Sequence, residues 1–226
     1  MKNIPLLIFL TLIISCSPTR KYESLAQKWE RDMLHFDSLN ASHTYPGNAI
    51  LFAGSSSIRL WDNIEEDMTP YPVIRRGYGG ASYADLAYYI ERIVYPHDFA
   101  ALVIFAGNDI WGQETDRSAG EVARLLKHIV KRVNAKFDTT PVFVIEVTHV
   151  PARAHLIHEI DAQNKALERV CGQFDHVHWV PTKQIYLTPE NKVNIDLFRK
   201  DNVHQNEKGY ALWTEQIKRK IKEVLY

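Results

Sequence analysis

The chain has 226 residues, of which 46% are hydrophobic, and its 27 lysines and arginines balance its 27 aspartates and glutamates. This length suits one α/β domain with a sizeable core and is short for two domains. The hydrophobic content excludes a disordered chain, and the lack of a basic stripe argues against a nucleic-acid partner.

Residues 1–15 predict a signal peptide. Lys2 supplies a positive charge, and an apolar stretch follows from Ile4 to Ile14 that is too short to span a bilayer. The stretch runs into "LIISC", which resembles a bacterial lipobox, where signal peptidase cuts before a cysteine that carries lipid. We therefore expect a lipoprotein of the cell envelope, periplasmic or on the outer membrane, held through lipid on Cys16. The alternative is an ordinary secretory segment with an incidental cysteine.

Residues 16–24 are polar and predict a tether, which leaves residues 25–226 as the folded domain. The domain begins with apolar residues at helical spacing from Leu25 to Leu39, which predicts a helix that packs one face into the core.

Short apolar segments then alternate with helix-length patterns. The segments expected to be strands are 49–54, 71–77, 101–107, 141–147 and 176–181, and the helical patterns cover 82–95, 117–134, 156–171 and about 206–225. Near-continuous apolar strands between helices indicate a parallel sheet covered on both faces. Ligands of such sheets bind beyond the carboxyl ends of the strands. The first three strands are followed by "GSSS", "GYGGAS" and "GNDIW", so these segments should meet at one edge.

Two of the candidate motifs are weak when each is considered alone. The segment from Gly77 to Ser82 partly matches a dinucleotide-binding fingerprint, but a serine replaces the third glycine. Its glycines still allow close backbone approach and anion binding. Near the end of the chain, Asp201 stands three residues before His204, a spacing at which a carboxylate can orient an imidazole base. For an isolated pair of this kind, local capping and solubility are the favoured explanation.

The ordered set of motifs is more specific than any one of them. "GSSSI", "GYGGAS", "GND" and "DNVH" resemble, in this order, the four conserved blocks of the SGNH hydrolases, also called the GDSL esterase/lipase family. The resemblance covers the chain from about residue 48 to its end. It implies a flavodoxin-like three-layer α/β/α sandwich around a five-stranded parallel sheet, in agreement with the alternation of strands and helices.

The resemblance also implies the site residues of an acyl-ester hydrolase that needs no metal or cofactor. The nucleophile of the family stands two positions after the glycine of the first block, which is Ser56 here, and the family's oxyanion-hole and triad positions match Gly80, Asn108, Asp201 and His204. The usual Gly-Asp-Ser is replaced by Gly54-Ser55-Ser56, with Ser57 next. The family spacing favours Ser56, places Ser55 in the aspartate position and lets Ser57 begin the helix.

Several other residues have both a structural and a functional interpretation. His155 and His158 have metal-ligand spacing on a helix, but solvated or structural histidines are the favoured interpretation. Cys171 is expected to be a buried thiol. Arg153 follows the fourth strand, where it could contact a substrate carboxylate or phosphate, although a surface position is favoured. Four aromatic residues lie near the blocks and could either pack in the core or line a substrate pocket: Trp61, Tyr78, Tyr83 and Trp111.

The sequence therefore predicts a lipid-anchored serine esterase that removes short acyl groups, such as acetyl, from carbohydrate. One alternative is a lysophospholipase or thioesterase that acts on longer acyl chains. Another is a catalytically silent carbohydrate-binding lipoprotein.

Overall fold

The computed structural model describes residues 18–226, so the predicted signal peptide and Cys16 lie outside the described residues. Five parallel strands form one sheet in the order β2-β1-β3-β4-β5. The strands are β1 (Ile50–Gly54), β2 (Val73–Gly77), β3 (Ala101–Phe105), β4 (Val142–Ile145) and β5 (Val177–Val180). The predicted α/β fold with a five-stranded parallel sheet is confirmed.

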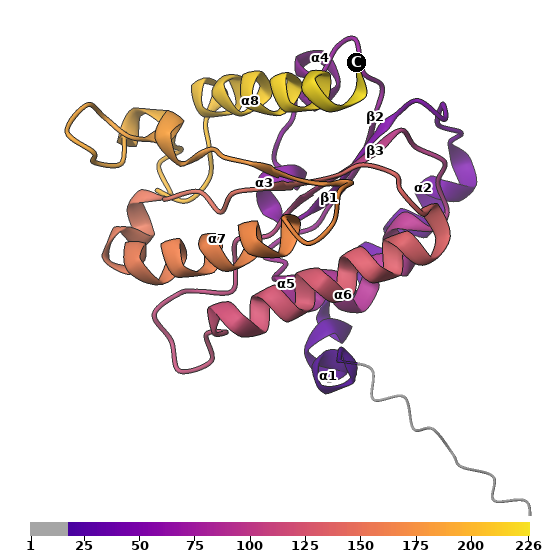
Figure 1. The fold of residues 1–226 in the computed structure, drawn as a ribbon, viewed down its shortest axis with the longest axis horizontal. Coiled ribbons are helices and arrows are strands. Elements are labelled where there is room, and N and C mark those ends of the chain that lie inside the picture. The colour runs from indigo at the N-terminus through magenta and orange to yellow at the C-terminus, as the bar shows by residue number, and fades with distance from the viewer. Residues whose placement is uncertain (1–17) are drawn as a thin grey trace, which may run out of the picture.

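Helices cover both faces of the sheet (Figure 1). One layer holds α1 (Glu23–Ala26), α2 (Glu30–Ser42), α5 (Tyr83–Val94), α6 (Ala119–Phe137) and α7 (Ile157–Cys171), and the other holds α3 (Ser56–Arg59), α4 (Ile64–Asp67) and α8 (Glu207–Leu225). Short 3-10 helices complete the chain: η1 (Arg20–Tyr22), η2 (Gln27–Trp29), η3 (Pro151–Leu156), η4 (Lys183–Tyr186) and η5 (Ile195–Leu197).

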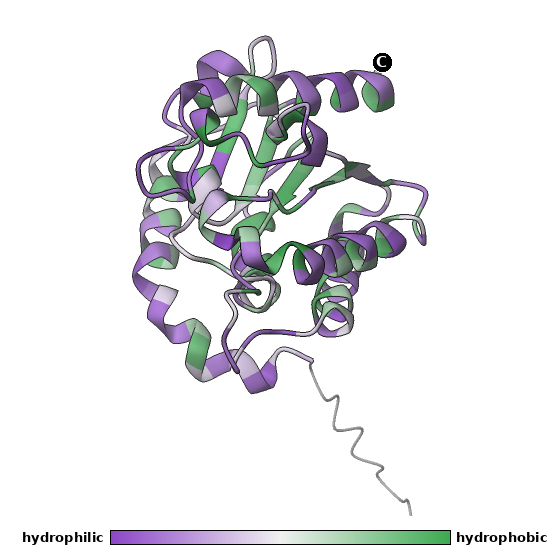
Figure 2. Ribbon diagram, turned by 90° about the vertical axis from the view of Figure 1, so that its left-hand side faces the viewer, coloured by the Kyte–Doolittle hydropathy of each residue, from purple (hydrophilic) through white to green (hydrophobic). Residues whose placement is uncertain are grey.

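The strands are apolar at almost every position because both faces of the sheet are buried. In β1, Leu51 and Ala53 pack into the core beneath α5, whereas Ile50 and Phe52 pack into the second core beneath α8. Figure 2 shows the hydrophobic strands enclosed by helices with largely hydrophilic outer surfaces. The carboxyl ends of the strands therefore meet at one edge, as the sequence predicts.

The N-terminal part of the domain differs from the prediction. The expected helix over residues 25–39 is divided into α1, η2 and α2, and Leu25 is 53% exposed rather than buried. The predicted tether over 16–24 is wrong for its second half, because Tyr22 in η1 is buried and its hydroxyl donates a hydrogen bond to Glu121 of α6. The folded part thus begins before Leu25.

Gly54 has a role that other residues could not fill. It ends β1 with φ +155°, and a Cβ at this position would collide with the carbonyl oxygen of Phe105 at the end of β3. Glycine therefore lets the two central strands stay paired up to the point where the chain turns toward Ser56.

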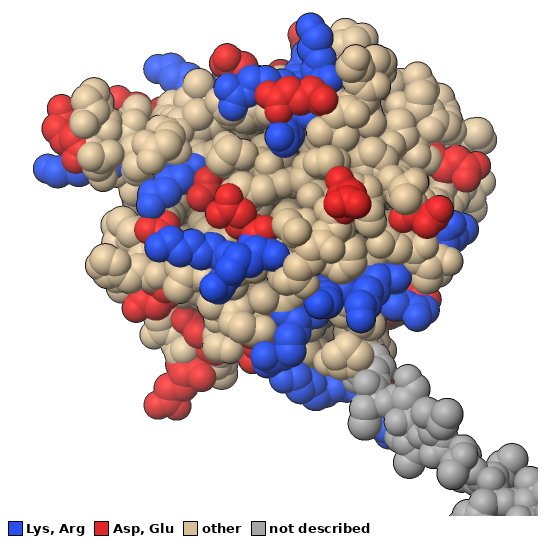
Figure 3. Space-filling view, in the orientation of Figure 1, with Lys and Arg blue, Asp and Glu red and all other residues tan. Residues whose placement is uncertain are grey.

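Positive charge gathers on the outer face of α6. Figure 3 shows a row of Lys and Arg side chains over this helix, close to the point where the described chain begins. Its exposed members are Arg124, Lys127, Lys131 and Lys136. Within residues 18–226, the helices are all too short or too polar to cross a membrane.

Candidate active site

The serine run occupies the turn from β1 into α3. Ser55 is the N-cap residue, and the helix begins at Ser56, one residue earlier than the sequence suggests. Ser55 and Ser57 are buried, with exposed fractions of 1% and 7%, whereas Ser56 is partly accessible. Of the three hydroxyl groups, that of Ser56 is thus the one best placed to meet a bound molecule.

Ser56 lies at one end of a chain of hydrogen bonds. Its Oγ is 2.8 Å from Nε2 of His204, and Nδ1 of His204 is 2.7 Å from Oδ2 of Asp201. An ionised carboxylate can only accept hydrogen bonds, so Nδ1 carries the proton and Nε2 is left as the acceptor for the Ser56 hydroxyl. The tautomer that a general base needs is thus set by Asp201.

Asp201 is held in its charged form. Burial alone would raise its pKa, but hydrogen bonds from the His204 backbone and ring and from the Val203 backbone lower the pKa to about 2. The backbone N–H groups of Val203 and His204 both donate to Oδ1 at 2.9 Å, while Oδ2 accepts from the imidazole. The same carboxylate therefore shapes the loop and orients the histidine.

Arg199 joins this loop to the helix that carries Ser56. Its backbone N–H donates to the carbonyl of His204 at 2.7 Å, and its Nε donates to the carbonyl of Gln205 at 3.0 Å. Its Nη2 donates to the carbonyl of Leu60, just beyond α3, at 2.9 Å. Sequence reasoning missed this residue, because its only signal was a basic side chain two positions before Asp201.

Gly80 and Asn108 lie on two neighbouring loops. Gly80 adopts φ +69°, which favours glycine, and Nδ2 of Asn108 donates to the carbonyl of the adjacent Ala81 at 3.0 Å. A second bond links the same loops, because Tyr83 N–H donates to Asp109 at 3.0 Å. These two bonds fix the loop after β2 against the loop after β3.

Asp109 is buried, and its pKa is higher than that of an ordinary aspartate. Burial raises its pKa to about 7, although the Tyr83 N–H and the nearby Arg117 oppose the shift. Its Oδ1 lies 3.4 Å from Nη1 of Arg117. The last residue of "GND" therefore acts as a structural link between loops, a role that the sequence analysis did not assign.

Ser56 and Asn108 line one small recess, together with Phe105, Val150 and Arg153. Its free volume is about 10 Å³, close to the space that one water molecule needs. Four of the five predicted residues therefore come together: Asp201, His204 and Ser56 form the hydrogen-bonded chain, and Asn108 lines the recess beside Ser56. Gly80 does not line the recess and lies on the adjoining loop, which Asn108 contacts at Ala81.

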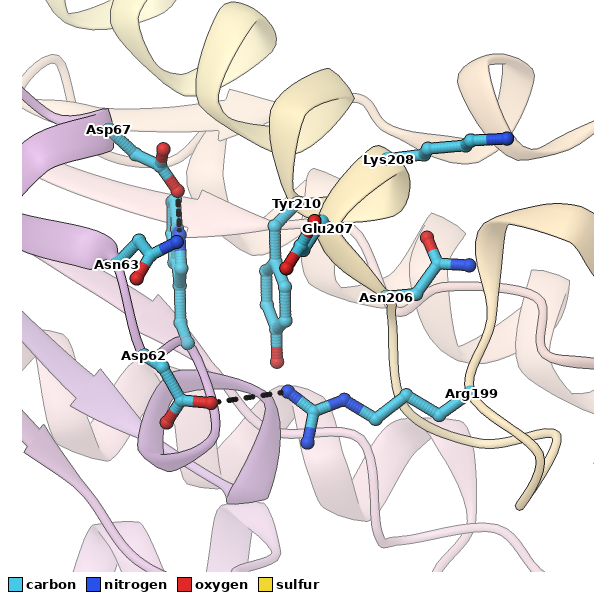
Figure 4. A pocket seen from close by; sticks show the side chains of 9 residues that line it. Asp62, Asn63, Asp67, Arg199, Asn206, Glu207, Lys208 and Tyr210 are labelled. Carbon is cyan, nitrogen blue, oxygen red and sulfur yellow. Dashed lines mark hydrogen bonds and ion pairs between the residues drawn. The ribbon is translucent and has the colours of Figure 1, made fainter.

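A larger groove of about 740 Å³ borders the loop that carries Asp201 and His204 (Figure 4). Figure 4 shows the Arg199 side chain extending toward Asp62, with Nη2 3.6 Å from Oδ2, while the ring of Tyr210 projects from α8 toward this pair. The lining residues are Trp61, Asp62, Asn63, Asp67, Arg199, Asn206, Glu207, Lys208 and Tyr210. Most are polar, so this groove suits a hydrophilic part of a ligand better than an acyl chain.

The prediction that Arg153 is a surface residue is wrong. Its side chain is 5% exposed and lies over the ring of Trp111, with Cζ 4.7 Å from the ring centroid. Nη1 donates to the backbone carbonyls of Gly107 and Ile110. The loop after β3 folds over the guanidinium, and the sequence around Arg153 does not predict this contact because the loop is more than 40 residues away.

The remaining candidates divide clearly. Trp61, Tyr78 and Tyr83 are core residues, whereas Trp111 is 38% exposed beside the recess. Cys171 is a buried free thiol, as predicted, and burial raises its pKa to about 12. Within the described chain, no three His, Cys, Asp or Glu side chains come together as a metal site would require.

A family model supplies the decisive comparison. The GDSL-like lipase/acylhydrolase family matches residues 37–212, more than half of the chain. The chain belongs to this family. Its predicted classification as a carboxylic ester hydrolase is therefore supported, and the fold matches those of solved family structures.

Solved structures share the fold at low sequence identity. A GDSL-like lipase from Bacteroides thetaiotaomicron is 20% identical, with a TM-score of 0.70 over 84% of this chain and 97% of that one. An acetyl xylan esterase is 18% identical, with a TM-score of 0.64 over 76% and 99%. A carbohydrate esterase family 3 protein from Talaromyces cellulolyticus is 17% identical, with a TM-score of 0.61 over 78% and 97%. A comparison with curated protein sequences finds no match.

Proposed function

We propose that this GDSL-family protein is a serine esterase that hydrolyses short acyl esters, such as acetyl esters, on carbohydrate. The observation that carries the proposal is the hydrogen-bonded chain from Asp201 through His204 to the accessible hydroxyl of Ser56. A buried nucleophile or a broken chain would favour a silent binding protein, and neither is present in the described residues.

In the proposed reaction, His204 Nε2 takes the proton of Ser56 as its Oγ attacks the ester carbonyl. Asp201 stabilises the imidazolium that forms. The tetrahedral intermediate collapses to an acyl-enzyme when His204 returns the proton to the leaving alcohol. Water then attacks the acyl-enzyme with His204 as the base, and the free acid leaves.

The negative oxygen of the tetrahedral intermediate needs hydrogen-bond donors that are already in place. We assign this role to the backbone N–H groups of Ser56 and Gly80 and to Nδ2 of Asn108. The bonds from Asn108 to Ala81 and from Tyr83 to Asp109 support the assignment, because they fix the relative positions of the two loops before substrate binds.

Replacing Asn108 with Ala tests the oxyanion assignment. We expect kcat to fall by about 10²–10³ with a much smaller change in KM, because the donor acts mainly on charge that develops in the transition state. Steady-state kinetics with a p-nitrophenyl ester measure both constants. The Asn134→Ala variant, in which the altered residue lies on α6 beside His176, is a control that should retain kcat. A variant at position 108 that raises only KM would contradict the role.

The preference for short acyl groups is inferred from the recess beside Ser56. The recess has little free space, about 10 Å³, which favours a compact acyl group over a long one. The polar groove next to the triad loop has room for a hydrophilic alcohol such as a sugar. Solved structures with the same fold include an acetyl xylan esterase and a carbohydrate esterase, which is in keeping with the proposed substrate class.

The proposal is tested by hydrolysis of p-nitrophenyl esters from acetyl to palmitoyl. We expect kcat/KM to be highest for acetyl and to decline as the chain lengthens. A maximum at long chains would favour the lysophospholipase or thioesterase alternative. A protein that cleaves none of the esters and still binds glycans would be the silent carbohydrate-binding lipoprotein.

We further propose that the protein is anchored to the cell envelope by lipid on Cys16. Cys16→Ala should release the protein from membranes or block its processing, because the acceptor for lipid is lost. Fractionation of cells expressing both forms measures the effect, and a conservative change at the next position, Ser17→Thr, provides the control. Normal processing and unchanged membrane association of the Cys16 variant would exclude the anchor.

A further inference from the structure

Arg153 is a buried cation at the wall of the recess that contains Ser56 and Asn108. Its guanidinium is held from two sides, by the ring of Trp111 and by the backbone carbonyls of Gly107 and Ile110. Nε is buried and has no hydrogen-bond partner. The proposed hydrolysis does not use this side chain, so its position requires a separate explanation.

The positive charge of Arg153 is not neutralised by the protein. Within residues 18–226, no carboxylate forms an ion pair with it. Asp109 and Asp116 are the acidic groups that act on it through space. Asp109 is paired with Arg117, and Asp116 accepts the backbone N–H groups of Trp111 and Gly112 at 2.8 and 2.7 Å. Buried charges are normally paired, because an unpaired charge loses its hydration without compensation.

A purely structural role does not account for this arrangement. The two carbonyls need only hydrogen-bond donors, and a neutral side chain could supply them without the cost of a buried charge. Arginine instead offers a planar fork of donors that matches a carboxylate, and ring stacking holds that plane in a fixed orientation. The recess beside it is small, which favours a carboxylate over the bulkier phosphate.

We propose that Arg153 binds a carboxylate of the substrate, so that the preferred substrates are acyl esters carrying an acidic group near the ester, such as acylated acidic sugars. This inference rests on the proposed esterase function and narrows its substrate class. Arg153 would then determine specificity, while Ser56 and His204 perform the chemistry on any ester that reaches them.

The test compares esters that carry a free carboxylate with counterparts in which that carboxylate is blocked as a methyl ester. One pair is p-nitrophenyl hemisuccinate and its methyl ester, with the carboxylate on the acyl side. The other is the acetyl ester of a hydroxynitrobenzoic acid and its methyl ester, with the carboxylate on the leaving group. Release of the nitrophenol gives kcat/KM for each compound. We expect the wild-type protein to prefer the charged member of at least one pair, and that pair identifies the side on which the carboxylate binds.

Arg153→Met should lower the charged-to-neutral ratio of kcat/KM by on the order of 10- to 100-fold, the usual effect of losing a hydrogen bond to a charged group. Arg153→Lys should keep part of the ratio, because it retains the charge. Arg124→Met is the matched control, since this arginine is exposed on the outer face of α6 and does not line the recess, so its loss should not change the ratio.

Using a ratio keeps the result interpretable if the variant loses activity generally through a shifted loop. Equal losses on charged and neutral esters in Arg153→Met, or a wild-type protein without any preference for a charged ester, would overturn the inference. The proposed function has a separate outcome: hydrolysis of these esters that persists in Ser56→Ala would exclude the esterase site itself.

Discussion

Replacing Ser56 with Ala is expected to reduce kcat by several orders of magnitude and to abolish labelling by a fluorophosphonate probe. The hydroxyl is the only group in the hydrogen-bonded chain that can form the acyl-enzyme, and loss of a triad nucleophile elsewhere costs about 10⁶-fold. Binding of an uncleaved substrate analogue should be retained, because the side chain is small and partly accessible. Kinetics together with peptide mapping of the probe adduct measure both effects.

The neighbouring serines provide matched controls within the same turn. Ser55→Ala and Ser57→Ala should still be labelled, since both hydroxyls are buried and neither contacts His204. No side-chain capping bond from Ser55 is present, so the cost to stability of removing its hydroxyl should stay near 1 kcal/mol or below. A probe adduct on Ser55 or Ser57 would mean that the assigned nucleophile is wrong.

Replacing Asp201 with Asn is expected to lower kcat by about 10⁴-fold. The amide can donate a hydrogen bond to Nδ1, which favours the imidazole tautomer with its proton on Nε2, and that tautomer cannot accept the proton of Ser56. KM should change less, because Asp201 faces His204 rather than the recess. Steady-state kinetics provide the comparison, and an NMR spectrum of the imidazole protons would show the change of tautomer directly.

The low pKa of Asp201 also predicts how the wild-type protein responds to pH. The folded Asp201 has a pKa of about 2, below the ordinary value of an aspartate, so its contribution to stability is present above the unfolded pKa and is lost as the pH falls toward 2. Above about pH 4, wild-type protein should therefore show no loss of activity from Asp201 protonation. Asp196→Asn, in an exposed position of the preceding segment, is the control and should behave like wild type. Similar losses in both variants would assign the effect to the loop rather than to His204.

The sheet could be predicted from the sequence because the pattern of a buried parallel strand depends only on residues within that strand. A strand buried on both faces is largely apolar, and each of the five predicted segments contains one observed strand, although β2 at the edge of the sheet includes Arg75 and Arg76. The same rule located the site, since parallel strands release their loops at one edge. It applied to the segments after β1, β2 and β3, whereas His204, 148 positions after Ser56, was assigned from the family resemblance.

What the sequence could not predict depends on contacts between distant segments. Arg153 lies in a segment that follows a strand, and only the loop from Gly107 to Ile110, folded over it, makes it a buried charge. Arg199 gained its role because its side chain reaches Leu60, far away in the sequence. Leu25 fits a helical stripe yet is exposed, because the helix breaks at η2 before the stripe can pack as one face.

The packing of η1 against α6 limits how far the domain could lie from a membrane anchor at Cys16. If lipid is attached at Cys16, the chain from there to Tyr22 covers six residue steps and spans at most about 20 Å when fully extended. Tyr22 is buried and its hydroxyl donates to Glu121, so the chain is fixed to the domain at this residue. The domain would then stay close to the membrane rather than range through the envelope, and it would reach only those acylated polymers that lie near the bilayer surface.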